Sequence, residues 1–166
     1  MLTYKGAMSR RPQGITLVEL MVTLAVAAIL LTIGVPVLRD FILNNRLTTH
    51  ANTLAASLAL ARAEAVRRNQ PVAIVPVAGD WSKGWTVGVD ANGDGIIDGE
   101  VVRSEGPAPD EVTVGASATT AVVFRVSGLA SRAESFRICD SRSGETGREV
   151  DLLSTGRAEV KSYACP

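Results

Sequence analysis

The 166-residue sequence has few of the side chains from which enzyme active sites are usually built. It contains one histidine, two cysteines and only 4% aromatic residues. It has no nucleophile motif, no glycine-rich phosphate loop and no histidine paired with a carboxylate. These absences argue against an enzyme. The single histidine, His50, has no cysteine or acidic cluster beside it, so we expect a surface residue and no metal ligand.

Charge is almost absent from residues 15–38, which contain a single ionisable side chain, Glu19. These 24 positions are enough to cross the hydrocarbon core of a bilayer, about 30 Å thick, as a helix. Lys5, Arg10 and Arg11 precede the segment and are expected to remain cytoplasmic, with the rest of the chain on the far side of the membrane. Beyond Gly14 the chain has 14 basic and 17 acidic residues, an excess of acid that a nucleic-acid binder would not show.

A small residue, Gly14, stands before the apolar segment and not after it. In a secretory signal the small residue of the cleavage site follows the apolar core, whereas here Gly14 precedes it. The residues QGITLVEL, 13–20, resemble the prepilin peptidase site of type IV pilins and type II secretion pseudopilins. That resemblance implies a leader at 1–14, cleavage after Gly14 and methylation of the new N-terminal residue, Ile15. The family usually has Phe there, so Ile15 departs from its pattern.

The same resemblance matches Glu19 to a functionally important glutamate of the family, four residues after the new N-terminus. A charged side chain at the centre of a membrane helix costs about 2.5–3.5 kcal/mol on insertion scales, and is expected to have a partner or a function. A free amine on Ile15 would supply a positive charge one helical turn away. We therefore expect Glu19 to neutralise the Ile15 amine of a neighbouring subunit; the alternative is a glutamate that simply reaches water.

A helical pattern continues beyond the apolar segment, over residues 39–70. Gly34 and Pro36 interrupt the span, and the helix is predicted to end near Asn69, before Pro71. Apolar residues recur at spacings of three and four, which is typical of an amphipathic helix with one buried face. They are Leu47, Ala51, Leu54, Leu58, Ala61 and Ala65.

Residues 71–166 change to the alternating pattern of β-strands and form the predicted globular head. Trp81 and Trp85 are expected to fill core or edge positions of this head. The predicted strands lie at 71–78, 84–90, 100–104, 120–126, 135–140, 148–154 and 157–163. The fold class is therefore α+β, a long N-terminal helix packed on an antiparallel β-sheet.

Two cysteines, Cys139 and Cys165, follow the membrane segment and suggest an exported domain with one disulfide. The pair is too far apart in sequence for a redox CxxC motif. Closing a loop of about 27 residues contributes roughly 3–4 kcal/mol in chain-entropy estimates. Two unpaired thiols in a cytosolic protein are the alternative.

The order of these segments resembles the GspH/FimT group of minor pilins and pseudopilins over nearly the whole mature chain. The ARAEAVRRNQPV helix end and the late Cys-containing strand followed by Gly156-Arg157 carry this resemblance. It implies a type IV pilin-like fold and an inner-membrane prepilin with a periplasmic head. It also implies assembly with the major pilin and other minor pilins, in the tip complex that primes a type IV pilus. A type II secretion pseudopilus is the alternative.

The segment DANGDGIIDGE is the one motif that suggests a metal. Asp90, Asn92, Asp94 and Asp98 match ligand positions of a calcium loop, but Glu100 stands one residue before the required acid. The alternative is a β-hairpin whose Asn-Gly and Asp-Gly pairs form tight turns, and this alternative is favoured. Calcium is therefore the only cofactor considered, as a weak site.

DNA binding is a further hypothesis. Some members of the group carry a basic GRxR motif linked to DNA uptake. Residues 156–159 are Gly-Arg-Ala-Glu here, so an acid replaces the second arginine. Because phosphate contacts dominate non-specific DNA affinity, this replacement weakens the hypothesis, which would depend on Arg157 and Lys161.

Overall fold

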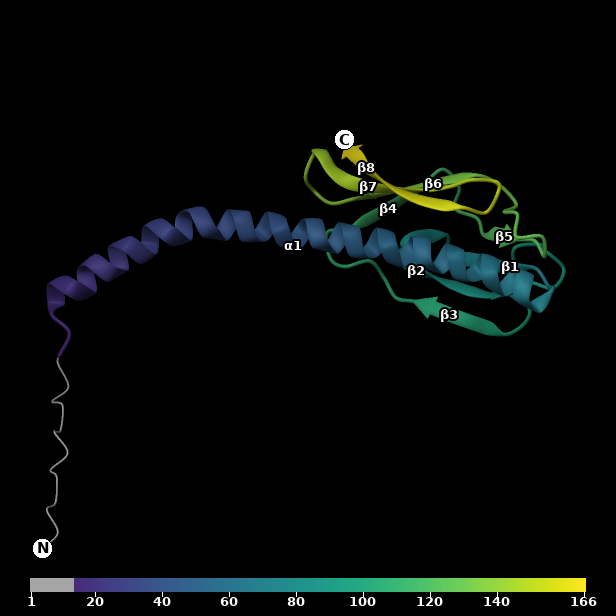
Figure 1. Ribbon diagram of the computed structural model, residues 1–166, viewed down its shortest axis with the longest axis horizontal. Helices are drawn as coiled ribbons and strands as arrows, with labels where there is room; N and C mark the ends of the chain where they lie inside the picture. Colours follow the sequence, from purple (N-terminus) through teal and green to yellow (C-terminus); the bar gives the residue numbers. More distant parts are fainter. Residues whose placement is uncertain (1–13) are drawn as a thin grey trace, which may run out of the picture. The chain divides into compact units, whose positions relative to one another are not determined.

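The computed structural model describes residues 14–166, apart from the side chains of residues 145 and 146. The predicted leader before Gly14, with its basic residues, lies outside the described residues. Helix α1 spans Leu17–Arg68 (Figure 1). The described strands are β1 (Val72–Val77), β2 (Asp80–Val89), β3 (Val101–Glu105), β4 (Thr113–Ala116), β5 (Val122–Phe124), β6 (Glu134–Cys139), β7 (Gly144–Leu152) and β8 (Ala158–Cys165).

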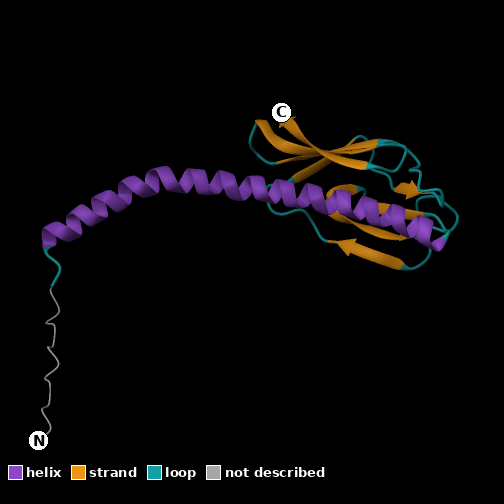
Figure 2. Cartoon of the chain, viewed as in Figure 1, coloured by secondary structure: helices purple, strands orange, loops and turns teal. Residues whose placement is uncertain are grey.

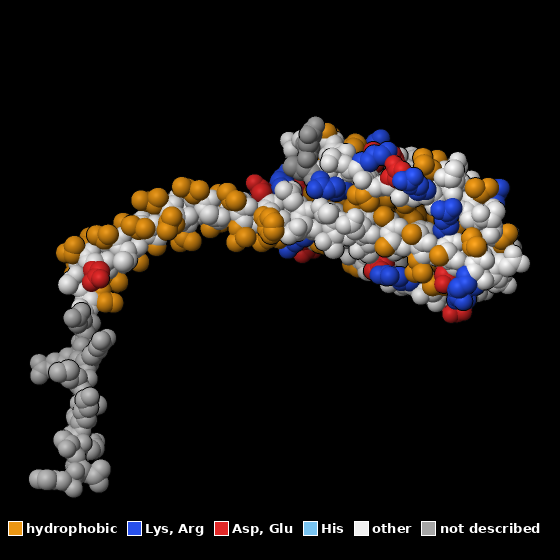
Figure 3. Space-filling view, in the orientation of Figure 1, with side chains coloured by type: hydrophobic (Ala, Val, Ile, Leu, Met, Phe, Trp, Pro, Cys, Tyr) orange, Lys and Arg blue, Asp and Glu red, His pale blue; other side chains and the backbone are white. Residues whose placement is uncertain are grey.

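The chain divides into two compact units at Asp40 and Phe41, and α1 runs through both. In the first unit the described helix is apolar and every residue is exposed, and Pro36 lies inside the helix without ending it. Hydrophobic side chains cover this part of α1 (Figure 3). By length and composition α1 is able to cross a membrane.

The second part of α1 is helical and amphipathic, as predicted. All six residues of the predicted stripe, from Leu47 to Ala65, are fully buried. The helix ends in a left-handed residue, Asn69, with φ of 53°. The backbone amide of Gln70 donates to the carbonyl of Ala65 at 3.3 Å, closing the last turn before Pro71.

The strands of the head form two antiparallel sheets (Figure 2). The first sheet has the order β3-β2-β1-β5, and the second has the order β4-β6-β7-β8. The predicted α+β pilin-like fold class is confirmed. Sequence pattern alone missed the short strand β4 and did not reveal the division into two sheets. Four residues that include Gly115 are too few to show an alternating pattern.

One hydrophobic core joins the two sheets and α1. Trp81 and Trp85 from β2 lie inside it, as predicted, at 2% and 0% exposure. The ring of Trp81 meets Phe136 of β6 edge to face at 4.8 Å, and its Nε1 donates to the carbonyl of Ala118 at 3.2 Å. Because Trp81 comes from the first sheet and Phe136 from the second, this contact ties the two sheets together.

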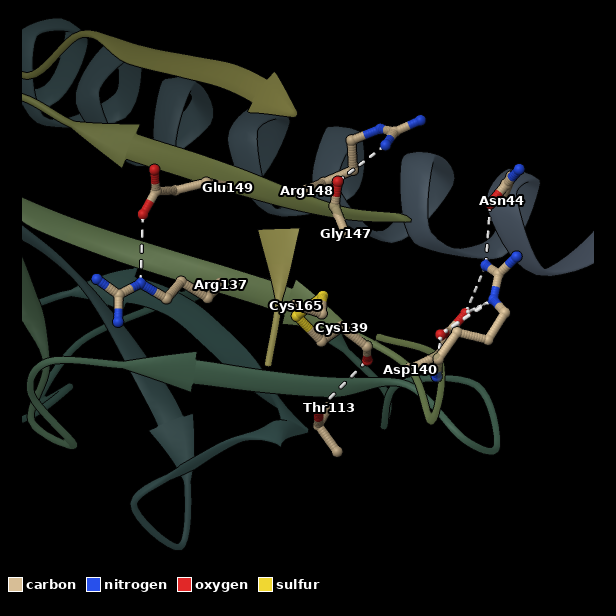
Figure 4. Close-up of a disulfide and its surroundings, with 10 residues drawn as sticks. Asn44, Thr113, Arg137, Cys139, Asp140, Gly147, Arg148, Glu149 and Cys165 are labelled. Atoms are coloured by element: carbon tan, nitrogen blue, oxygen red, sulfur yellow. Dashed lines mark hydrogen bonds and ion pairs between the residues drawn. A yellow bond between two sulfur atoms is a disulfide. The ribbon is translucent and has the colours of Figure 1, made fainter. Parts of the chain in front are cut away.

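A disulfide between Cys139 and Cys165 ties the C-terminal strand to β6, which confirms the predicted pairing (Figure 4). The two residues lie on β6 and β8, which flank β7 in the second sheet. Gly147 of β7 leaves room for the disulfide, since a Cβ atom there would lie 2.3 Å from the Cys165 sulfur. Nearby, Arg142 donates to Asn44 of α1 at 2.9 Å and to Asp140 at 2.7 Å.

Gly147→Ala is expected to lower the free energy of unfolding by about 1–3 kcal/mol, because the new methyl group meets the disulfide and the Ile138 carbonyl. Urea unfolding of the full chain in detergent measures the change. Gly115→Ala is the matched control, since Gly115 is exposed in the same sheet and its Cβ would meet nothing closer than 3.9 Å. That control is expected to change stability by about 0.5 kcal/mol or less. Equal effects of the two variants would contradict the steric explanation.

Candidate functional site

The predicted processing site lies at the start of the described chain. Gly14 is exposed and not helical, and a Cβ atom there would meet no other atom within 4 Å. Ile15 is 74% exposed. Helix α1 begins two residues later, at Leu17. The residues on both sides of the predicted cleavage bond are therefore accessible to a protease.

Glu19 lies in the first turn of α1. Its backbone amide donates to the side chain of Thr16 at 3.2 Å, which makes Thr16 the N-cap of the helix. A carboxylate in the first turn is favoured by the positive end of the helix dipole. Glu19 itself forms no ion pair with any residue of the described range 14–166.

The loop between β2 and β3 is held together by the carboxylate of Asp90, which is fully buried. Asp90 Oδ1 accepts hydrogen bonds from the amides of Gly93 and Asp94 at 2.9 and 3.2 Å. Asp90 Oδ2 accepts one from the amide of Gly95 at 2.9 Å. Gly93 and Gly95 have φ of 75° and 89°, which glycine adopts without strain.

The remaining acids of the predicted calcium set also have partners within the chain, either backbone amides or an arginine. Asp98 accepts from the amide of Ala91 at 2.9 Å, and Asp94 accepts from the amide of Ile96 at 2.8 Å. Glu100 pairs with Arg68 of α1 at 2.7 Å. Among residues 14–166, no three His, Cys, Asp or Glu side chains are grouped to hold a metal. The geometry therefore supports the hairpin-turn alternative, and calcium binding gains no support from it.

Asp90→Ala is expected to lower the free energy of unfolding by about 2–4 kcal/mol, because three backbone amides lose a charged acceptor. The loss is expected to be the same in calcium and in EDTA, as measured by thermal unfolding of the full chain. A calcium-dependent rise in Tm that Asp94→Ala abolishes would contradict this and support a calcium site.

The residues proposed for DNA contact are paired within the head. Arg157 forms an ion pair with Glu159 at 3.2 Å, and Lys161 forms one with Asp151 at 2.5 Å. The hydrogen bond from Lys161 lowers the pKa of Asp151, and the same bond raises the pKa of Lys161. These partners offset both cations, so the geometry does not favour a phosphate-binding site at this pair.

His50 is buried, and the expectation of a surface histidine was wrong. Its side chain lies on the stripe of α1 that faces the sheets, and its ring meets Trp85 edge to face at 5.3 Å. Nε2 is buried without a hydrogen-bond partner. Burial lowers the pKa of His50, and the nearby charge of Glu105 opposes this only in part. Periodicity contained the signal, because His50 precedes Ala51 and follows Leu47 by three residues.

The lowered pKa of His50 predicts that the head loses stability in mild acid. Below about pH 6.5 the unfolded chain binds a proton at His50 that the folded chain resists, so stability falls as pH decreases through this range. The urea midpoint of the full chain is expected to be lower at pH 5.5 than at pH 7.5. His50→Gln, which does not titrate there, is expected to reduce this difference. An unchanged difference in that variant would show that another group is responsible.

Two family models match the chain. The model described as type II transport protein GspH matches residues 50–156, and that of the prokaryotic N-terminal methylation motif matches residues 9–35. No curated protein sequence is significantly similar to the chain.

Solved structures of related fold come from two bacteria. The type IV minor pilin FimU of Pseudomonas aeruginosa is 26% identical in two crystal forms, which cover 74% and 72% of this chain and 96% and 100% of FimU, with TM-scores of 0.63 and 0.60. The minor pseudopilin EpsH of the Vibrio cholerae type II secretion system is 10% identical, covering 74% of this chain and 96% of EpsH, with a TM-score of 0.52. The likeness to EpsH concerns the fold alone.

Proposed function

Because this chain belongs to the family of the type II transport protein GspH, whose members are pilin-like structural proteins and not enzymes, we propose that it is a minor pilin of a type IV pilus. The observation that carries the proposal is the 26% identity to the minor pilin FimU over 96% of that chain. The N-terminal methylation motif implies processing by prepilin peptidase and assembly with other pilins.

The proposed processing steps follow from the first residues of the described chain. Prepilin peptidase cleaves after Gly14, which leaves Ile15 as the N-methylated terminus. Lys5, Arg10 and Arg11 hold the leader on the cytoplasmic side, and residues 15–38 cross the inner membrane once. Residues 39–70 continue the helix into the periplasm, where residues 71–166 complete the head.

Assembly then depends on Glu19. Cleavage creates a positive charge at Ile15, and Thr16 caps a helix that carries Glu19 in its first turn. The side chain of Glu19 has no cation partner within its own described chain. In a filament whose subunits are staggered along the axis, Glu19 of one subunit pairs with the Ile15 amine of its neighbour, and both charges become easier to hold in an apolar core.

A position near the pilus tip, in the complex that primes assembly, is the finer part of the proposal. The tip-most subunits of related pseudopilins typically lack the glutamate, so the presence of Glu19 favours a position below the outermost subunit. Such a subunit contacts neighbours on both sides.

A minor pseudopilin of a type II secretion system is the second candidate, supported by the description of the family model that matches residues 50–156. The two functions differ in phenotype. Deletion of a minor pilin is expected to abolish piliation and twitching, whereas deletion of a pseudopilin abolishes secretion of exoproteins. Normal piliation with lost secretion would replace the first candidate by the second.

Glu19→Val is expected to leave cleavage and membrane insertion intact and to reduce incorporation into sheared filaments by about tenfold or more, since the neighbouring amine loses its partner. Immunoblots of membrane and filament fractions measure both. Thr32→Val is the matched control, because it removes a polar side chain that bonds only to the Ile29 carbonyl one turn earlier. A Glu19→Val subunit that enters filaments as well as this control would overturn the assembly role.

A further inference from the structure

An open groove of about 670 Å³ runs between α1 and the start of β8. We call it the α1–β8 groove. Its apolar lining comes from Ala55, Ala59, Ala63 and Val66 of the helix and Ala158 of the strand. On the face seen in Figure 3, hydrophobic side chains line the strip between the helix and the β7–β8 hairpin, with basic side chains beside it.

The groove is open because the edge of the second sheet extends beyond the cover of α1. Val160 of β8 pairs with Val150 of β7, so their side chains share a face of the sheet. Val150 is fully buried, whereas Val160, on the edge strand, is 37% exposed. Across the groove the helix offers alanines such as Ala59, which are too short to fill the space. The inner face of β8 is therefore only partly covered, at Ala158 and Val160.

A positive charge without a partner lies in the groove. Arg67 and Arg157 pair with acids, but Arg62 forms no ion pair or hydrogen bond with any described residue. Its side chain is packed beneath two turns at Gly128 and Gly156, where a Cβ atom would approach Arg62 Nε to 3.2 Å. The two turns are joined by a hydrogen bond from Ala130 to Ser154 at 3.0 Å. Arg62, which is exposed, thus lies beside an apolar surface with no described acid paired to it.

We propose that the α1–β8 groove is the docking site for an amphipathic helix of another pilin subunit, one that presents bulky apolar side chains next to a carboxylate. The proposal rests on assembly with other pilins and applies equally to a pilus or a pseudopilus. The carboxylate pairs with Arg62, and the apolar side chains cover Ala158 and Val160.

The shape of the groove favours a helix. Ala55, Ala59 and Ala63 repeat every four residues along about 12 Å of α1, so a second helix can approach this flank closely. The strip over β8 beside α1 is where such a helix would lie against the sheet. The apolar lining favours a protein over a nucleic acid, because a phosphate backbone gains nothing from alanine and valine side chains.

Site-specific photo-cross-linking of the full chain in living cells tests the proposal. A photoreactive residue at position 59 is expected to cross-link to a helical, acid-containing peptide of another pilin-like subunit, identified by mass spectrometry. The matched control is position 56, also an exposed alanine of α1 but outside the groove. Equal cross-linking from both positions, or a cross-linked peptide without a carboxylate, would overturn the proposal.

Charge reversal gives a second, independent measurement. Arg62→Glu is expected to reduce the cross-link from position 59 by about tenfold or more, the loss typical of a central interface residue. Arg46→Glu, which reverses an exposed arginine of the same helix outside the groove, is expected to leave it unchanged. Immunoblots check that the variants accumulate equally. An Arg62→Glu cross-link equal to that of wild type would overturn the charge pairing on which the proposal depends.

Failure of this proposal is distinguishable from failure of the proposed function. Cross-links to pseudopilins would reject the type IV pilus and keep the docking site. If deletion abolishes piliation but position 59 gives no cross-link, the pilus function is kept and the docking site is rejected. The purified full chain is also tested for DNA binding. If it retains DNA and Arg62→Glu abolishes this retention, the groove binds nucleic acid, and a helix is rejected as its occupant.

Discussion

The head of this protein depends on the burial of one stripe of α1. The stripe, from Leu47 to Ala65, is fully buried in a core that draws on both sheets. Three leucines and three alanines make up the stripe, and the small alanines let the sheets pack close to the helix. The pair Trp81 and Phe136 then connects one sheet to the other, and the disulfide secures the last strand.

The charges of the head divide into those with a structural partner and those without one. The acids of the β2–β3 loop accept backbone amides, and Glu100 pairs with Arg68, so this loop orders itself without a bound ion. The cations Arg157 and Lys161 are likewise paired on β8 and its flanking turn. Glu19 at the start of α1 and Arg62 in the groove are two of the described charges that have no such partner, and both lie where another subunit is proposed to bind.

Sequence periodicity predicted the helix, its end near Asn69 and seven of the eight described strands, because these depend on local patterns of apolar residues. It missed β4, whose four residues are stabilised by pairing with β6 and not by their own pattern. It also misplaced His50. Its spacing of three residues from Leu47 places His50 on the apolar stripe, and in the structure the Trp85 ring of β2 packs against it.

The sequence by itself predicted the processing and assembly end of the protein, since the roles proposed for Gly14, Ile15 and Glu19 depend on their order along a short segment. It also predicted that Cys139 and Cys165 pair, with two unpaired thiols as the alternative, and the structure confirmed the disulfide. Only the tertiary structure decided the use of the DANGDG loop, where the carboxylate of Asp90 turns inward to three amides. Only the tertiary structure, too, brought Arg62, Gly128 and Gly156 together beside the partly exposed edge strand β8. These features depend on contacts between residues up to about a hundred positions apart in the chain, which no local pattern can specify.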